Sequence, residues 1–282
     1  DASCRSEPSD CPGGITYLGW NPVQGGNRCN RGSGVEEVTC SEGVLSVTLN
    51  PLFWNPNWDR QDCSTEACDD PAVRDRRSDV RVIQTLRFIK QHVVELDYTV
   101  INLSDLDHAS TAQEMPTVYT ANGHGDTADL WRLFDSEGTE IPIDTPAGGD
   151  GFYYENFESP GGWAAMHNDD ATYGVGLYTE NRITAMQGWQ LRSLPFNNFR
   201  PIFPFAIPPH GTVRARAYLL IGGLGTIAAE ADWLDTHLPP FGCLDAPLAE
   251  AGLQGKKVYG KGSGPIPVYG EITPDRATAA LA

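Results

Sequence analysis

Three side chains that can transfer protons lie in one short polar stretch of the chain. Glu114, Tyr119 and His124 supply a carboxylate, a phenol and an imidazole. The stretch follows a long run of alternating residues, so we predict that it is a loop held by a sheet, where catalytic groups are often found. Met115 and Pro116 beside Glu114 would partly desolvate the carboxyl group and raise its pKa toward the range that a general acid needs.

A second polar stretch runs from Trp163 through His167 and Asn168 to Asp170, and Glu180 ends the glycine-spaced strand that follows. Glycoside hydrolysis needs two carboxyl groups, about 5–5.5 Å apart for retention or about 6.5–9.5 Å apart for inversion. With Glu114 as the acid/base, Asp170 and Glu180 are the candidate partners. Tyr119, His124 and His167 are further candidate catalytic residues.

Residues suited to sugar binding are abundant in the polar segments. Aromatic faces stack on the C–H surfaces of sugars, while amides and guanidinium groups hydrogen-bond the hydroxyls. The candidate substrate-binding residues are Trp54, Trp58, Asn122, Trp163, Asn168 and Arg182. The competing interpretation of each tryptophan is packing in the core.

Two other functions are consistent with the same residues. A polysaccharide lyase would use a His or Tyr base, with Asn, Gln or Arg neutralising the uronate carboxyl group. The formal net charge of −17 disfavours a polyanionic substrate, so hydrolysis is preferred. The third function is a non-catalytic glycan-binding or structural surface protein, in which Glu114 is a turn residue.

The sequence predicts no cofactor. Asp126, Asp129 and Asp150 lie in glycine-containing segments and are candidate calcium ligands, but no EF-hand spacing is present and no metal site is assigned. Phosphate-binding glycine motifs and the G-x-S-x-G pattern are also absent.

The charge and hydrophobicity of the 282 residues exclude several partners. A net charge of −17 repels phosphate backbones, so carbohydrate is the expected partner and nucleic acid is not. No run reaches the roughly 18 apolar residues of a membrane span. The sequence leaves the oligomeric state open.

Six of the seven cysteines lie in the first quarter of the chain, as is typical of disulfide-stapled secreted proteins. We therefore predict an extracellular or periplasmic location. The six cysteines predicted to be oxidised are Cys4, Cys11, Cys29, Cys40, Cys63 and Cys68. Sequence proximity favours Cys4–Cys11, Cys29–Cys40 and Cys63–Cys68, although six cysteines allow 15 pairings.

Period-two hydrophobicity predicts a mainly β protein. Residues 78–103 form two strands with a turn near residues 90–92, and further strands are expected over residues 35–38, 44–49, 162–166, 173–179, 183–191 and 212–222. One helix is expected over residues 225–237. The predicted fold is a large antiparallel two-sheet β-sandwich with long loops, in a single domain of residues 1–282. Within it, residues 1–77 are disulfide-stapled and residues 255–282 form an extended Gly- and Pro-rich tail.

The run from His92 to Asp105 reads as a strand that ends at Asn102 and a tight polar turn. This pattern resembles the large sandwiches related to galactose mutarotase, which include several polysaccharide lyases. The resemblance implies a concave sheet that lays a sugar chain across its face. It carries over no catalytic residue.

Overall fold

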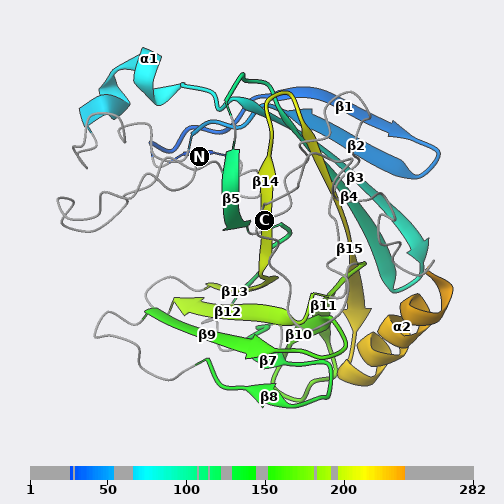
Figure 1. Ribbon diagram of the computed structural model, residues 1–282. Coiled ribbons are helices and arrows are strands. Elements are labelled where there is room, and N and C mark those ends of the chain that lie inside the picture. The colour runs from blue at the N-terminus through cyan, green and yellow to red at the C-terminus, as the bar shows by residue number, and fades with distance from the viewer. Residues whose placement is uncertain are drawn as a thin grey trace, which may run out of the picture.

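A computed structural model describes residues 26–27, 29–53, 66–106, 108–113, 115–121, 129–143, 152–180, 183–191 and 196–238. Antiparallel strands dominate these ranges, and one long helix, α2 (Leu224–His237), accompanies them (Figure 1). The predicted all-β sandwich is confirmed. Two short helical turns, η2 (Glu66–Asp69) and α1 (Pro71–Arg74), were not predicted.

The larger sheet has nine strands in the order β1-β2-β3-β4-β15-β11-β10-β7-β8. The strand bounds are β1 Val35–Ser41, β2 Val44–Leu49, β3 Val80–Lys90, β4 Val93–Asn102, β7 Arg132–Phe134, β8 Glu140–Ile141, β10 Trp163–His167, β11 Gly174–Thr179 and β15 Thr212–Gly222. The predicted hairpin over residues 78–103 is confirmed, because β3 and β4 pair and their turn is residues 91–92.

A smaller sheet of four strands covers one face of the larger sheet near β10 and β11. Its order is β6-β13-β12-β9, with bounds β6 Val118–Ala121, β9 Phe152–Glu158, β12 Ala185–Leu191 and β13 Phe196–Pro201. Met186 and Phe199 of the smaller sheet pack on Leu133, Met166 and Leu177 of the larger one. This apolar layer holds the two sheets together.

Alternation along β15 separates the two faces of the larger sheet. Ala217 contributes to the layer beneath the smaller sheet, whereas Tyr218 and Leu220 face α2. The prediction that α2 has one apolar face is confirmed, since its buried side chains pack on the same side. Trp163 is a correction: it is 4% exposed and packs in the α2 cluster, so it is unavailable for stacking on a sugar.

The expected loop between residues 113 and 119 is partly strand. Gln113 is the last residue of β5 (His108–Gln113), which pairs with β14 (Phe203–Ile207), and Tyr119 lies in β6. The short polar side chains of β5 lack an apolar alternation, which is why periodicity did not reveal the strand. Between the two strands, Met115 is buried in the core beside Phe205 and Ile207.

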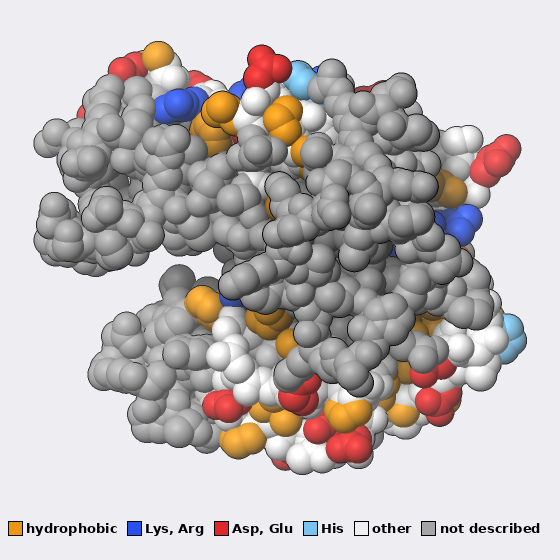
Figure 2. Space-filling view, in the orientation of Figure 1, with side chains coloured by type: hydrophobic (Ala, Val, Ile, Leu, Met, Phe, Trp, Pro, Cys, Tyr) orange, Lys and Arg blue, Asp and Glu red, His pale blue; other side chains and the backbone are white. Residues whose placement is uncertain are grey.

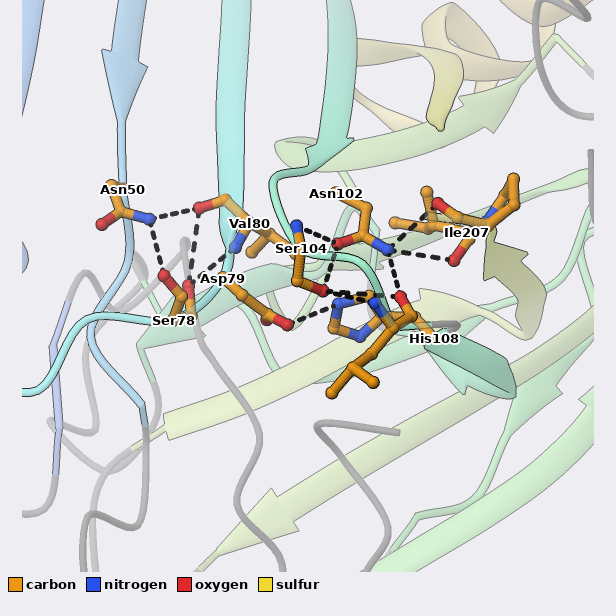
Figure 3. Close-up of polar contacts among 10 residues, drawn as sticks. Asn50, Ser78, Asp79, Val80, Asn102, Ser104, His108 and Ile207 are labelled. Atoms are coloured by element: carbon orange, nitrogen blue, oxygen red, sulfur yellow. Dashed lines mark hydrogen bonds and ion pairs between the residues drawn. The ribbon is translucent and has the colours of Figure 1, made fainter. Parts of the chain in front are cut away.

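Asn102 ties the end of β4 to the end of β14 (Figure 3). Its side chain is 1% exposed. The Nδ2 group donates to the carbonyls of Leu106 at 2.7 Å and Pro208 at 3.0 Å, and Oδ1 accepts from the Ser104 N–H and hydroxyl, both at 2.9 Å. The polar turn expected after Asn102 is therefore confirmed, and the asparagine satisfies backbone groups that the strands leave open.

An Asp–His pair fixes the start of β5 close by. His108 Nε2 lies 3.2 Å from Asp79 Oδ2, at the start of β3 (Figure 3). Burial alone would raise the pKa of Asp79, but the hydrogen bond and charge of His108, with the Ser104 hydroxyl, lower it below its usual value. The pair therefore links the two-stranded sheet to the larger sheet electrostatically.

One described disulfide joins Cys29 to Cys68, 39 residues apart. The Cys29–Cys40 and Cys63–Cys68 pairings are wrong, and Cys40 is an exposed free thiol rather than an oxidised residue. Cys40 lies in β1 opposite Leu45, and the hairpin holds it in register with β2. Cys4, Cys11 and Cys63 lie outside the described residues, as does the tail of residues 255–282. In the described part of the chain, no helix is long and apolar enough to cross a membrane.

Candidate functional site

The outer face of the smaller sheet carries a compact group of polar and aromatic residues. Cross-strand register sets Tyr119 of β6 opposite Asn198 of β13, which in turn lies opposite Trp189 of β12. In the next row, Arg200 lies opposite Gln187. Since alternate residues of a strand share a face, all of these positions lie on the face that points away from the larger sheet.

Side-chain contacts connect these residues into one unit. Arg200 Nη2 donates to Gln187 Oε1 at 2.6 Å, and the Trp189 indole N–H donates to the same oxygen. Gln187 Nε2 donates to Asn156 Oδ1 of β9 at 2.5 Å. The Arg200 guanidinium lies 4.8 Å from the centre of the Trp189 ring, in the range of a cation–π contact. The hydrogen bonds and the stacking orient the guanidinium over the sheet.

Asn198 adds a buried acceptor to this face. Its side chain is 4% exposed, and its Oδ1 has no hydrogen-bond partner among the described residues. A buried carbonyl oxygen without a donor costs about 1–3 kcal/mol. A ligand hydroxyl could supply that donor. We refer to Tyr119, Asn156, Gln187, Trp189, Asn198 and Arg200 as the polar face.

Sequence reasoning missed most of the polar face. Trp189 stood out only as one of several tryptophans, and the amides of Asn156, Gln187 and Asn198 were not selected. A signal was present, because Met186, Gly188 and Gln190 alternate with Gln187 and Trp189 in β12. The partner strand β13 reads Phe-Asn-Asn-Phe-Arg-Pro, which has no clean alternation, so the pairing that completes the face could not be predicted.

Several predicted site residues lie outside the described part of the chain. They are Trp54, Trp58, Glu114, Asn122, His124, Asp126, Asp150 and Arg182. The polar face was therefore built without them.

The structure separates the second predicted stretch from the polar face. Asp170 accepts hydrogen bonds from the Thr172 hydroxyl at 2.6 Å and the Thr172 N–H at 3.2 Å, and the hydroxyl bond lowers its pKa. Asn168 Oδ1 accepts from the Tyr173 N–H at 3.0 Å. Both residues shape the turn between β10 and β11 of the larger sheet. The polar face points away from that sheet, so pairing Asp170 with a catalytic residue there is a correction we make.

His167 is fully buried at the end of β10, with its ring edge toward Phe134 at 5.6 Å between centroids. Burial lowers its pKa, the backbone of Tyr173 opposes that change, and Arg132 adds to it. A buried neutral imidazole at this position is a packing residue. Among the described residues, which include the buried Asp129, no group of three His, Cys, Asp or Glu side chains is arranged to hold a metal ion.

Glu180 lies on the side of the larger sheet opposite the smaller sheet, in a row of charges. Arg216 Nη2 lies 2.9 Å from Asp97 Oδ2, and Arg216 Nη1 lies 3.6 Å from Glu180 Oε1. Burial raises the pKa of Glu180, Arg216 lowers it, and the carboxylates of Asp97 and Glu95 raise it further. Glu180 therefore has the direction of pKa shift that a general acid needs, but the larger sheet separates it from the polar face.

The raised pKa makes Glu180 a source of pH-dependent instability. Because the folded state holds this proton more tightly than the unfolded state, stability falls as pH rises from the unfolded-state pKa through the folded-state pKa. We expect Glu180→Gln to flatten this part of the curve when urea midpoints are measured across mildly acidic pH. The difference between wild type and variant isolates Glu180 from carboxyl groups such as Asp170, whose pKa is lowered. Parallel curves for the two proteins would contradict the assignment.

Comparisons with known proteins give a weak likeness of fold. No family model matches the chain, and no curated protein matches it. Among solved structures, a putative mutarotase from Salmonella typhimurium is 11% identical with a TM-score of 0.37, covering 79% of this chain and 78% of that one. A putative aldose 1-epimerase from Escherichia coli is 11% identical with a TM-score of 0.36, covering 69% of each chain.

A heparan sulfate lyase from Pedobacter heparinus is 8% identical with a TM-score of 0.30, covering 68% of this chain but 22% of that one. The suspected resemblance to galactose-mutarotase-like sandwiches is therefore confirmed as a weak structural resemblance. At these identities and TM-scores it concerns the fold alone, and nothing about activity follows from it.

Proposed function

We propose that the chain is a secreted carbohydrate-active enzyme that binds a glycan on the polar face and cleaves glycosidic bonds, with Glu114 as the acid/base. One observation carries the proposal. Trp189, Gln187, Arg200 and Asn156 form a connected unit beside the buried acceptor of Asn198. Amide, guanidinium and indole groups on one rigid sheet suit a ligand rich in hydroxyls.

The connectivity of the chain relates Glu114 to this face. Gln113 ends β5, and β6, which bears Tyr119, begins at Val118. Five residues of extended chain reach at most about 18 Å, so Glu114 stays within that distance of Tyr119. Asn122 and His124 follow closely after Ala121, the last residue of β6, which keeps them near the same edge. The partner carboxyl group of Glu114 stays unassigned.

Elimination is the second candidate reaction, and the register favours it specifically. Tyr119 lies opposite Asn198, and Arg200 is two residues further along the same strand. A tyrosine base beside an amide and a guanidinium could remove the proton next to a uronate carboxyl group. An eliminating enzyme leaves a C4–C5 double bond that absorbs ultraviolet light, whereas hydrolysis leaves a saturated sugar.

Binding is tested with two variants and a matched control. We expect Trp189→Ala and Arg200→Ala each to weaken glycan binding at least tenfold in affinity electrophoresis, since hydrogen bonds to a charged group contribute about 1.5–3 kcal/mol. Trp131→Ala is the control, because Trp131 is 39% exposed, precedes β7 of the larger sheet and bonds Asp169. Unchanged affinity in both polar-face variants, with circular dichroism intact, would remove the polar face as the binding surface.

A further inference from the structure

Strand β1 leaves one edge of the nine-stranded sheet open. All seven of its residues are exposed, and in the described part of the chain it pairs with β2 alone (Figure 1). Exposed edge strands usually carry Lys or Pro or are very short, because their free backbone groups attract other strands. The sequence Val-Glu-Glu-Val-Thr-Cys-Ser has neither Lys nor Pro. This edge therefore lacks the usual protection against pairing.

Apolar side chains accompany the open edge. Val35 is 56% exposed, Val38 is 59% exposed and Leu45 of β2 is 37% exposed. Val38 lies opposite Val47, which packs against the core beneath the sheet. Val38 therefore extends the apolar layer beyond the last strand, and a further strand would continue it. Figure 2 shows a mixed surface around the described side chains rather than one extended charged patch.

We propose that β1 pairs antiparallel with β1 of a second copy of this chain, across a two-fold axis at Val38. The two nine-stranded sheets then form one continuous sheet. A closed two-fold contact of this kind uses the same strand from both copies, so it leaves no further open edge at β1. This inference is independent of the proposed function.

The charges along β1 select this register. With the axis at Val38, Glu37 faces Thr39 and Glu36 faces Cys40 of the second copy, so no carboxylates face each other. An axis at Glu36 or Glu37 would set a glutamate against itself, which destabilises a strand pair. An axis at Thr39 would bring Glu36 against Glu42 of the turn. Only the axis at Val38 uses the whole strand without opposing like charges.

The net charge predicts how the dimer responds to salt. Each copy carries −17, so the two copies repel each other over long distances. Salt screens this repulsion while the apolar and backbone contacts stay. The dimer dissociation constant should therefore fall as ionic strength rises, and reductant should leave it unchanged, because Cys40 faces Glu36.

Sedimentation equilibrium over a wide concentration range tests the proposal. Wild type should approach twice the monomer mass. Val38→Lys and Val38→Glu should each raise the dimer dissociation constant at least tenfold, since either places two like charges at the axis, whereas Val38→Thr should retain the dimer. A dimer weakened only by a general charge effect would respond oppositely to Lys and Glu. Phe88→Lys is the control, because Phe88 is 71% exposed but lies on β3, two strands from the edge.

Cross-linking tests the register directly. In a Cys40→Ser background, Val38→Cys should give a covalent dimer on mild oxidation, because directly opposed residues lie about 4.5–5.5 Å apart between Cα atoms, within disulfide reach. Thr39→Cys should cross-link far less. A wild-type protein that stays monomeric at every soluble concentration overturns the proposal, as does preferential cross-linking through residue 39.

Discussion

Glu114→Gln is expected to lower the rate of glycan cleavage by roughly 10²–10⁴ while leaving the melting temperature unchanged. Glutamine keeps the shape and hydrogen-bonding capacity of the side chain but cannot donate or accept the catalytic proton. The rate is measured by release of reducing ends from a panel of neutral and acidic glycans. Affinity for the substrate should be retained, because the polar face is intact.

Two comparisons keep this result interpretable. Trp189→Ala should chiefly raise KM, whereas Glu114→Gln should chiefly lower kcat, since the first removes binding and the second removes proton transfer. If Glu114→Gln melts several degrees lower yet turns over normally, Glu114 is a turn residue and the non-catalytic reading gains. Ultraviolet absorbance in the wild-type product, lost in Tyr119→Phe, would replace hydrolysis by elimination.

Asn102→Leu is expected to lower the free energy of unfolding by about 2–4 kcal/mol. Leucine fills a similar volume but leaves the carbonyls of Leu106 and Pro208 and the Ser104 N–H without their partner in a buried place. Urea denaturation should show a lower midpoint with an unchanged m-value. The loss should not depend on pH near neutrality, because an amide does not titrate.

Ser104→Ala is the matched variant for this prediction. It removes the hydroxyl that donates to Asn102 Oδ1 but keeps the backbone N–H on the same oxygen. We expect a loss below about 1 kcal/mol. Equal losses in the two variants, or a loss below about 0.5 kcal/mol for Asn102→Leu, would mean that the turn and not the asparagine amide holds β4 to β14.

The strands that periodicity located were those with one buried face. β3, β4 and β15 alternate clearly because the core lies on one side of them, and α2 carries its apolar residues on one side for the same reason. β5 and β13 escaped prediction because their polar residues are matched by partners from distant parts of the chain. Residue types along one strand do not encode which strand lies beside it.

The candidate site divides in the same way. The amino-acid types alone indicated sugar chemistry, an all-β sandwich and the polar turn after Asn102, because these depend on side-chain chemistry and local alternation. Only the tertiary structure decided which groups meet. It buried Trp163 under α2, set Asp170 in a turn and put Glu180 behind the larger sheet. It brought Trp189, Asn198 and Arg200 together through pairing of β12 with β13, because register between strands is fixed by the packing of whole sheets and not by neighbours in the chain.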